Sequence, residues 1–380
     1  MPKIEATSPI WRLVMAFTGV GSTMLGPLLP HLLGQWRLHD HEAGMLVGCL
    51  FLGSFAGTLT MSQHLRRCLQ RGACMAALGC LLFAWSTHQS HGFGAGMLAL
   101  ALMGFGLGHL MSSLNLLVGT APVSIRARQL ANLGAAWCVG AVLSPCLSTV
   151  LLVGISPSIR LCLFAPLYLL PLFVAPVETP FAPRTLQSLP AGRRKHLPAG
   201  AMLCTLAFLV YGGIEASIGA WVPVFATRYS SGPLVAAQWI LSLFWIGLIA
   251  GRLLMARFVS PVIENVLLRT AMLASLICLL WLLVSSSFAQ IAVATAVMGI
   301  CISPLFPLLL STALSGGYSN RVMGVMLACC ALGSALLPWL LGVLSSSFSL
   351  RVGMMLPIAA LLSLALFRWN APRLVQQQTA

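Results

Sequence analysis

The sequence is poor in charge, and it is poorest in acid. Only 6 of its 380 residues are Asp or Glu, and all charged residues together make up 7%. Soluble domains carry about 25% charged residues, so this composition excludes an ordinary soluble protein. The mean hydropathy is +0.95 and hydrophobic residues make up 59% of the chain. These values indicate an integral membrane protein that crosses the bilayer many times.

The sequence also lacks the motifs of common enzyme, metal and nucleotide sites. It has no P-loop lysine motif, no HExxH, no paired CxxC and no pair of carboxylates, so we expect no enzymatic activity, no cofactor and no metal. The 12 cysteines follow no metal spacing and are expected to be small buried side chains. His39 and His41, with Asp40 and Glu42 beside them, could be read as a metal cluster, although a solvated polar turn is the interpretation we favour.

Hydropathy predicts a bundle of helices that each need about 20 apolar residues to cross a bilayer. The first begins near Ile10 and is too long for a signal peptide, so we expect it to be a spanning helix without a cleavage site. The predicted spans number twelve: 10–33, 43–65, 73–90, 94–118, 130–153, 159–177, 200–227, 234–257, 265–286, 289–314, 322–345 and 351–369.

The basic residues give the expected orientation of these spans. With the N-terminus inside, only four of the 21 Lys and Arg residues (Arg37, Arg160, Arg228 and Arg351) would lie outside, and the other 17 would lie inside. The positive-inside rule then predicts that both termini are cytoplasmic. Because the net charge of +15 is spread over these short loops, we expect no nucleic-acid partner.

The chain divides into two similar halves. Residues 178–199 carry four prolines and an RRK cluster, which predicts a cytoplasmic linker between six-helix units at 1–177 and 200–380. Glycines and prolines recur in both units at nearly one offset. The matches are Gly19/Gly212, Gly26/Gly219, Pro30/Pro223, Gly140/Gly333 and Pro145/Pro338 at 193 residues, Gly53/Gly247 and Gly57/Gly251 at 194, and Gly104/Gly299 at 195. We therefore predict an all-α membrane fold of two pseudo-symmetric six-helix bundles, with a binding site between them near the midplane.

Glu215 is the only acid that lies inside a predicted span, and the repeat places it opposite Ser22. A carboxylate near the middle of the bilayer costs roughly 2.5–3.5 kcal/mol on insertion scales, so such residues usually face a cavity and have a function. Burial favours the neutral form of the acid, and no Lys or Arg is expected at its depth. We predict that Glu215 is a proton carrier; the alternative is a structural acid that bonds a neighbouring helix.

Polar and aromatic side chains in other spans are candidates for solute binding. An amide and indole rings suit the hydroxyls and the apolar faces of a sugar, although packing or lipid anchoring is the alternative role for each. Trp221 lies about −120° around the helix from Glu215, so it shares that face only if the glycines and Pro223 break the helix. The candidates are Asn115, His109, Trp137, Tyr211, Trp221, Trp245 and Trp339.

Arginines at the predicted inner ends of helices are candidates for gating. Arg252 and Arg257 lie five residues apart, where they are expected to snorkel to headgroups or to hold the following loop when the inner gate closes. Arg66 and Arg67 follow the second span, in a segment without an Asp. Arg252 and Arg257 are not expected to contact the solute.

Several of these segments resemble a known family. The segment YGGIEASIGAW at 211–221 resembles Y-x-G-x-E-x-S-I-G-x-W of the fucose and glucose/galactose type sugar–proton symporters of the major facilitator superfamily. FWIGLIAGRLLMAR at 244–257 resembles their W-x-G-x-x-x-G-R stretch, and GFGLGHLMSSLN, SPLFPLLLS and LGSALLPWLLG also fit. The resemblance implies a sugar substrate and proton coupling. The fucose type carries acids on its first and fourth helices, whereas this chain has Gly and Met there, near Gly26 and Met111.

We therefore expect a secondary active transporter of a bacterial inner membrane. It would move a small solute, with a sugar as the first candidate, by alternating access coupled to protons through Glu215. We expect a monomer whose partners are the solute, protons and membrane lipid. Two alternatives stay open: a proton-driven exporter of drugs or lipophilic cations, which the same carboxylate would attract, and a receptor built on a transporter scaffold.

Overall fold

The computed structural model describes residues 9–61, 64–119, 123–149, 156–174, 199–230, 234–258, 264–315 and 320–376, and every regular element in these ranges is helical. The expected linker at 178–199 lies almost wholly outside them, so its boundaries stay predictions. The first half contains α1 (Pro9–Thr23), α2 (Leu25–Gln35), α3 (Asp40–Leu59), α4 (Leu65–His88), α5 (Phe93–Gly119), α6 (Val123–Thr149), α7 (Pro157–Phe164), η1 (Ala165–Leu169) and α8 (Leu170–Val174). The second half contains α9 (Ala199–Tyr229), α10 (Leu234–Phe258), α11 (Glu264–Val284), α12 (Phe288–Ile302), α13 (Leu305–Ser315), α14 (Asn320–Ser347), α15 (Leu350–Gly353) and α16 (Met355–Gln376).

These helices confirm the predicted membrane fold. Eight stretches are long and apolar enough to cross a bilayer, and α1 with α2 and α12 with α13 each form one of them. Three shorter apolar stretches occupy the sixth, eighth and twelfth positions, at Pro157–Phe173, Trp239–Met255 and Leu350–Ala365, and α6 occupies the fifth. The protein is thus an all-α membrane protein of two six-helix bundles.

Some predicted boundaries were wrong, and the errors share a cause. α4 begins at Leu65 and α6 at Val123, each several residues before the predicted start. Their first turns carry basic residues, as in LRRCLQR and VSIRARQ. A helix can continue past the apolar layer because arginine stems lie along it while their charges reach water, and hydropathy assigns such a turn to a loop. The seventh span does not break at its glycines or at Pro223, since α9 runs unbroken through Pro223.

Close helix contacts repeat in the two halves. In the first half, a Cβ on Gly19 would meet the Trp137 carbonyl oxygen, and one on Gly140 would meet that of Ala16. In the second half, the same residue pairs displaced by 193 positions make the same contacts: Gly212 with Cys330, and Gly333 with Leu209. Backbones approach this closely only where there is no side chain. The repeated contacts confirm that the recurring glycines mark a duplicated unit.

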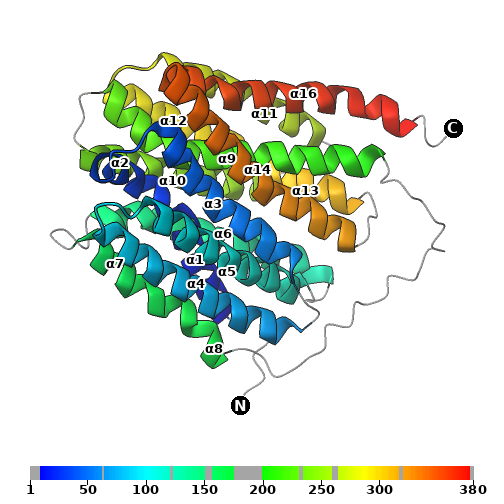
Figure 1. Cartoon of the computed structure of the whole chain (residues 1–380). Coiled ribbons are helices and arrows are strands. Elements are labelled where there is room, and N and C mark those ends of the chain that lie inside the picture. Colours follow the sequence, from blue (N-terminus) through cyan, green and yellow to red (C-terminus); the bar gives the residue numbers. More distant parts are fainter. Residues whose placement is uncertain are drawn as a thin grey trace.

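The two bundles pack against each other, with the first half in the lower part of Figure 1 and the second half in the upper part. A Cβ on Gly26 of α2 would meet the carbonyl oxygen of Gly219 of α9, so these two equivalents of the repeat touch each other. The pseudo-twofold relation between the halves therefore passes close to this contact. Gly44 of α3 also packs on Trp339 of α14. We call the end of the molecule with the α2–α3 connection the outer end, following the predicted orientation.

Asp40 corrects one expectation from the sequence. It is the first residue of α3, it is only 6% exposed, and it forms an ion pair with Arg228 of α9. It does not lie in a solvated turn, because the helix begins early enough to bury its carboxylate between the halves. Glu42 instead accepts the His39 backbone N–H at 2.8 Å and caps its own helix. Among the residues described, no three His, Cys, Asp or Glu side chains gather as metal ligands.

We predict that Gly333→Ala lowers the melting temperature of the purified protein. Its new Cβ would strike the Leu209 carbonyl, and overpacking of this kind costs about 1–3 kcal/mol. Gly324→Ala on the same helix is the control, because no atom lies within 4 Å of the position that its Cβ would take, and alanine favours helix. Thermal unfolding in detergent measures both melting temperatures. Equal melting temperatures for the two variants would contradict the packing argument.

Candidate functional site

Glu215 lies on the face of α9 that is directed into the molecule. Its carboxylate accepts a hydrogen bond of 3.0 Å from the hydroxyl of Tyr211, one helical turn earlier. Tyr211 is buried and Glu215 is half-buried. Gly219, one turn later on the same face, is the residue that meets Gly26 of the first half. Glu215 therefore sits one turn from the contact that relates the two halves.

A half-buried cation lies near this acid, contrary to the expectation from the sequence. The guanidinium of Arg252, from α10, lies within electrostatic range of the Glu215 carboxylate, although these two described side chains form no ion pair. Its Nη1 donates a hydrogen bond of 2.8 Å to Sγ of Cys138, on α6 of the first half. Hydropathy placed Arg252 at the inner end of its span, but its long side chain turns into the protein. Arg252 therefore lies near the acid of its own half and bonds a thiol of the other half.

Two tryptophans form an aromatic corner next to the acid. Trp137 of α6 and Trp245 of α10 meet edge to face, with ring centroids 5.4 Å apart. A Cβ on Gly219 would lie 3.4 Å from the Trp245 ring, so this corner adjoins the Glu215 face of α9. Within the described part of the chain, neither buried indole N–H has a hydrogen-bond partner. Buried donors are nearly always paired in native proteins, so these two are available for an acceptor that is not part of the chain.

Asn115 and Ser22 lie together in the first half. The Asn115 amide donates to the Met111 carbonyl oxygen of its own helix at 2.9 Å. The Ser22 hydroxyl donates to the Thr18 carbonyl at 2.8 Å and lies 3.9 Å from the Met111 sulfur. Ser22 and Asn115 are both half-buried. Because Ser22 is the repeat equivalent of Glu215, this group is the uncharged counterpart of the acid.

Two of the candidates are packed within one half. His109 is 2% exposed, its Nε2 lies 3.3 Å from the Thr60 hydroxyl, and its ring packs on Phe105. Trp221 is fully buried, and its indole N–H donates to the Pro338 carbonyl at 3.1 Å. With α9 unbroken, Trp221 points away from the Glu215 face. Both residues thus take the packing role that was their alternative.

The other candidates lie apart from the acid. Trp339 packs on Gly44 where α14 meets α3, so it belongs to the contact between the halves. Arg66 and Arg67 are exposed in the first turn of α4. The side chain of Arg257 lies outside the described residues. The structure therefore brings together Glu215, Tyr211, Trp137 and Trp245, and it adds Arg252 and Cys138, which the sequence had not placed there.

This arrangement, an acid and a cation of the second bundle where it meets the first, agrees with a comparison to known families. The model of the Major Facilitator Superfamily matches residues 13–315. The chain belongs to this superfamily.

Relatives of this facilitator-superfamily protein cover nearly its whole length. A glucose/galactose transporter of Brucella abortus biovar 1 (strain 9-941) is 24% identical over 87% of this chain and 85% of its own. The structure of FucP, a Major Facilitator Superfamily transporter in the outward conformation, covers 96% of this chain and 99% of its own at 16% identity and a TM-score of 0.66. A D-xylose–proton symporter covers 95% and 96% at 14% identity and a TM-score of 0.70.

Membership of the Major Facilitator Superfamily makes this chain a multi-pass membrane transporter, not an enzyme. The structures share its fold and, at their low identity, carry no information on its solute. The site must therefore be interpreted from its own residues.

We predict that Glu215 and Arg252 are energetically coupled. Glu215→Gln leaves an arginine that cannot lose its charge, and Arg252→Gln leaves a carboxylate without its cation. The double variant should lose less stability than the sum of the two singles, by about 0.5–3 kcal/mol for neighbouring charges. Thermal unfolding of all four proteins measures this difference. Additive effects would contradict the pairing, and the exposed Arg66→Gln combined with Glu215→Gln is the additive control.

Proposed function

We propose that this protein moves a neutral sugar across a bacterial inner membrane by alternating access, coupled to protons through Glu215. The observation that carries the proposal is Glu215, with Arg252 nearby, beside two indole donors that have no partner among the described residues, where the two bundles meet. Both termini would be cytoplasmic, as the distribution of basic residues favours. The protein would act as a monomer.

The aromatic corner supports a sugar as the solute. A sugar offers C–H faces that pack on indole rings and hydroxyl oxygens that accept hydrogen bonds. Trp137 and Trp245 present both kinds of surface, one from each half of the protein. A solute that bonds both would also join the halves. A curated relative, the glucose/galactose transporter of Brucella abortus, points to the same class.

The nearby charge of Arg252 supports proton coupling. An ionised Glu215 attracts Arg252, and a protonated Glu215 attracts it less. Arg252 also bonds Cys138 of the other half, so the protonation state of the acid alters a contact that crosses the interface. A proton taken up on one side and released on the other would thereby favour different positions of the bundles. In this mechanism the proton resides on the Glu215 carboxyl group, and the Tyr211 hydroxyl holds that group in place.

The same pair argues against the exporter of lipophilic cations. That alternative needs an uncompensated carboxylate that attracts a positive solute. The charge of Arg252 partly offsets that of an ionised Glu215, and it leaves a net positive site when the acid is protonated. A cationic solute would meet repulsion in one state and little attraction in the other. A neutral solute avoids this cost.

We predict that Glu215→Gln abolishes uptake of labelled sugar driven by a pH gradient and preserves sugar exchange without one. A glutamine cannot carry a proton, but it keeps the shape of the site. The bundles can therefore still change position with sugar bound, and sugar exchange continues. Proteoliposomes tested with glucose, galactose, fucose and xylose measure both activities.

Glu42→Gln is the control for this experiment, since Glu42 caps its own helix and should leave both activities unchanged. Gradient-driven uptake by Glu215→Gln would refute Glu215 as the carrier. Efflux of a fluorescent lipophilic cation that depends on Glu215, with no sugar uptake, would favour the exporter.

We predict that Trp245→Phe and Trp137→Phe each raise the KM for the transported sugar roughly 2- to 12-fold, as expected for the loss of one neutral hydrogen bond worth about 0.5–1.5 kcal/mol. The phenyl ring keeps the apolar face and removes the N–H donor. Trp85→Phe is the control, because Trp85 is 57% exposed on α4. Unchanged KM values for both corner variants would place the sugar elsewhere.

A further inference from the structure

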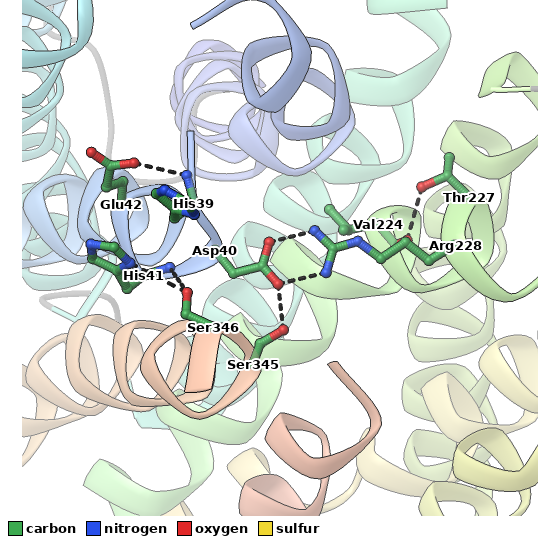
Figure 2. A network of polar contacts seen from close by, with 9 residues as sticks. All are labelled: His39, Asp40, His41, Glu42, Val224, Thr227, Arg228, Ser345 and Ser346. Carbon is green, nitrogen blue, oxygen red and sulfur yellow. Dashed lines mark hydrogen bonds and ion pairs between the residues drawn. The ribbon is translucent and has the colours of Figure 1, made fainter. Parts of the chain in front are cut away.

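An ion pair joins the two halves at the outer end, far from Glu215. The carboxylate of Asp40, at the start of α3, accepts hydrogen bonds from both terminal nitrogens of Arg228, near the end of α9, one of them at 2.5 Å (Figure 2). It also accepts the hydroxyl of Ser345 from the end of α14. Asp40 comes from the first half, and its partners come from the second.

Neighbouring contacts join the halves at the same place, the junction of α3 with α9 and α14, which we call the seam. The backbone N–H of His41 donates to the hydroxyl oxygen of Ser346 at 2.8 Å, and His41 Nδ1 lies 3.3 Å from the same oxygen (Figure 2). One turn before Ser346, Gly342 allows the Asp40 carbonyl to approach α14. The first turn of α3 is thus attached to the last turns of both α9 and α14.

The burial of this pair is uneven, and that matters for its energy. The Asp40 side chain is 7% exposed, whereas that of Arg228 is 39% exposed. A buried carboxylate that loses its only cation is costly, so the pair stabilises the closed arrangement. When the halves separate, water reaches both groups and repays part of that cost. The ion pair therefore stabilises the closed arrangement, and solvation of its two groups lowers the free energy that opening requires.

The position of the Asp40–Arg228 pair along α9 indicates which gate it would control. Arg228 lies 13 residues after Glu215 on the unbroken α9, which is about 20 Å along the helix at 1.5 Å per residue. The pair thus lies well outside the proton site, on the route from the outer end. For two bundles that rock as rigid bodies, exposing the central site to that end requires α3 to leave α9 and α14.

We propose that Asp40, Arg228 and Ser345 form the latch of the outer gate, which must break each time the transporter opens outward. The latch holds one carboxylate of the first half between two helices of the second. It requires the two halves to move apart, but it depends neither on a sugar as the solute nor on Glu215 as the proton carrier.

Cross-linking across the seam tests the latch directly. His41→Cys with Ser346→Cys places two thiols where the two side chains now meet, and a mild oxidant should join them only while the outer end is closed. A protease site inserted between residues 178 and 199 then shows whether the two halves remain linked on a gel. Single-cysteine proteins control for the native cysteines, and reductant should release the halves.

In this background we expect Asp40→Asn and Arg228→Gln to slow the cross-linking about tenfold, because the closed state loses its buried pair. Arg228→Lys keeps the charge but loses the two-pronged geometry, and it should give an intermediate rate. Because Arg228 is exposed, its variants test the latch even if Asp40→Asn folds poorly. Glu42→Gln, two residues from Asp40 but bonded within its own helix, should match the parent.

Equal cross-linking rates in Arg228→Gln and the parent would overturn the proposal. So would a Glu42→Gln variant that slows as much as Arg228→Gln, since the effect would then follow net charge and not the pair. The assay contains neither sugar nor proton gradient, so failure of the proposed transport function leaves its outcome unchanged.

Discussion

An ionised side chain inside a membrane has no bulk water to solvate it, and the described charges in the interior of this protein meet that constraint where the two bundles face each other. Glu215 and the nearby Arg252 both belong to the second half, and Arg252 reaches across to Cys138 of the first. At the outer end, Asp40 and Arg228 belong to opposite halves. Arg252 and Asp40 thus each have a polar partner in the other half, so a change in charge or in the position of the halves alters these contacts.

The packing of the chain separates what stays rigid from what can move. Within each half, paired glycines such as Gly19 with Gly140 bring helix backbones together, and the second half repeats the contact. Such contacts are lost by sub-ångström shifts, so each bundle is expected to move as a unit. Between the halves, the described outer contacts include one ion pair and two serine hydroxyls that water can replace. When the bundles rock, the polar contacts between the halves break and are replaced by water, whereas the close glycine contacts within each half stay intact.

α9 links the two charged sites. It carries Tyr211, Glu215 and Arg228 on one continuous helix of 31 residues, so a tilt that repositions the acid also moves the latch. The central acid and the outer pair can thus respond to one motion without a chain of intermediate side chains. The duplicated fold supplies the pivot, where Gly26 and Gly219 touch.

The sequence by itself determined the membrane class, the number of spans and the duplication, and it singled out Glu215 as the one acid inside a predicted span. Hydropathy, glycine spacing and the rarity of acid are properties of the chain that hold in any packing. It could not place Arg252 or Asp40 correctly, because hydropathy assigns a residue to the depth of its backbone and to a span or a loop. The direction of a long side chain depends on neighbours that are distant in the sequence. So does the burial of a carboxylate at a helix end. Only the tertiary structure brought Arg252 near Glu215 and paired Asp40 with Arg228, because charge compensation is a property of helices in contact. It also left two indole N–H groups beside Glu215 without a partner among the described residues.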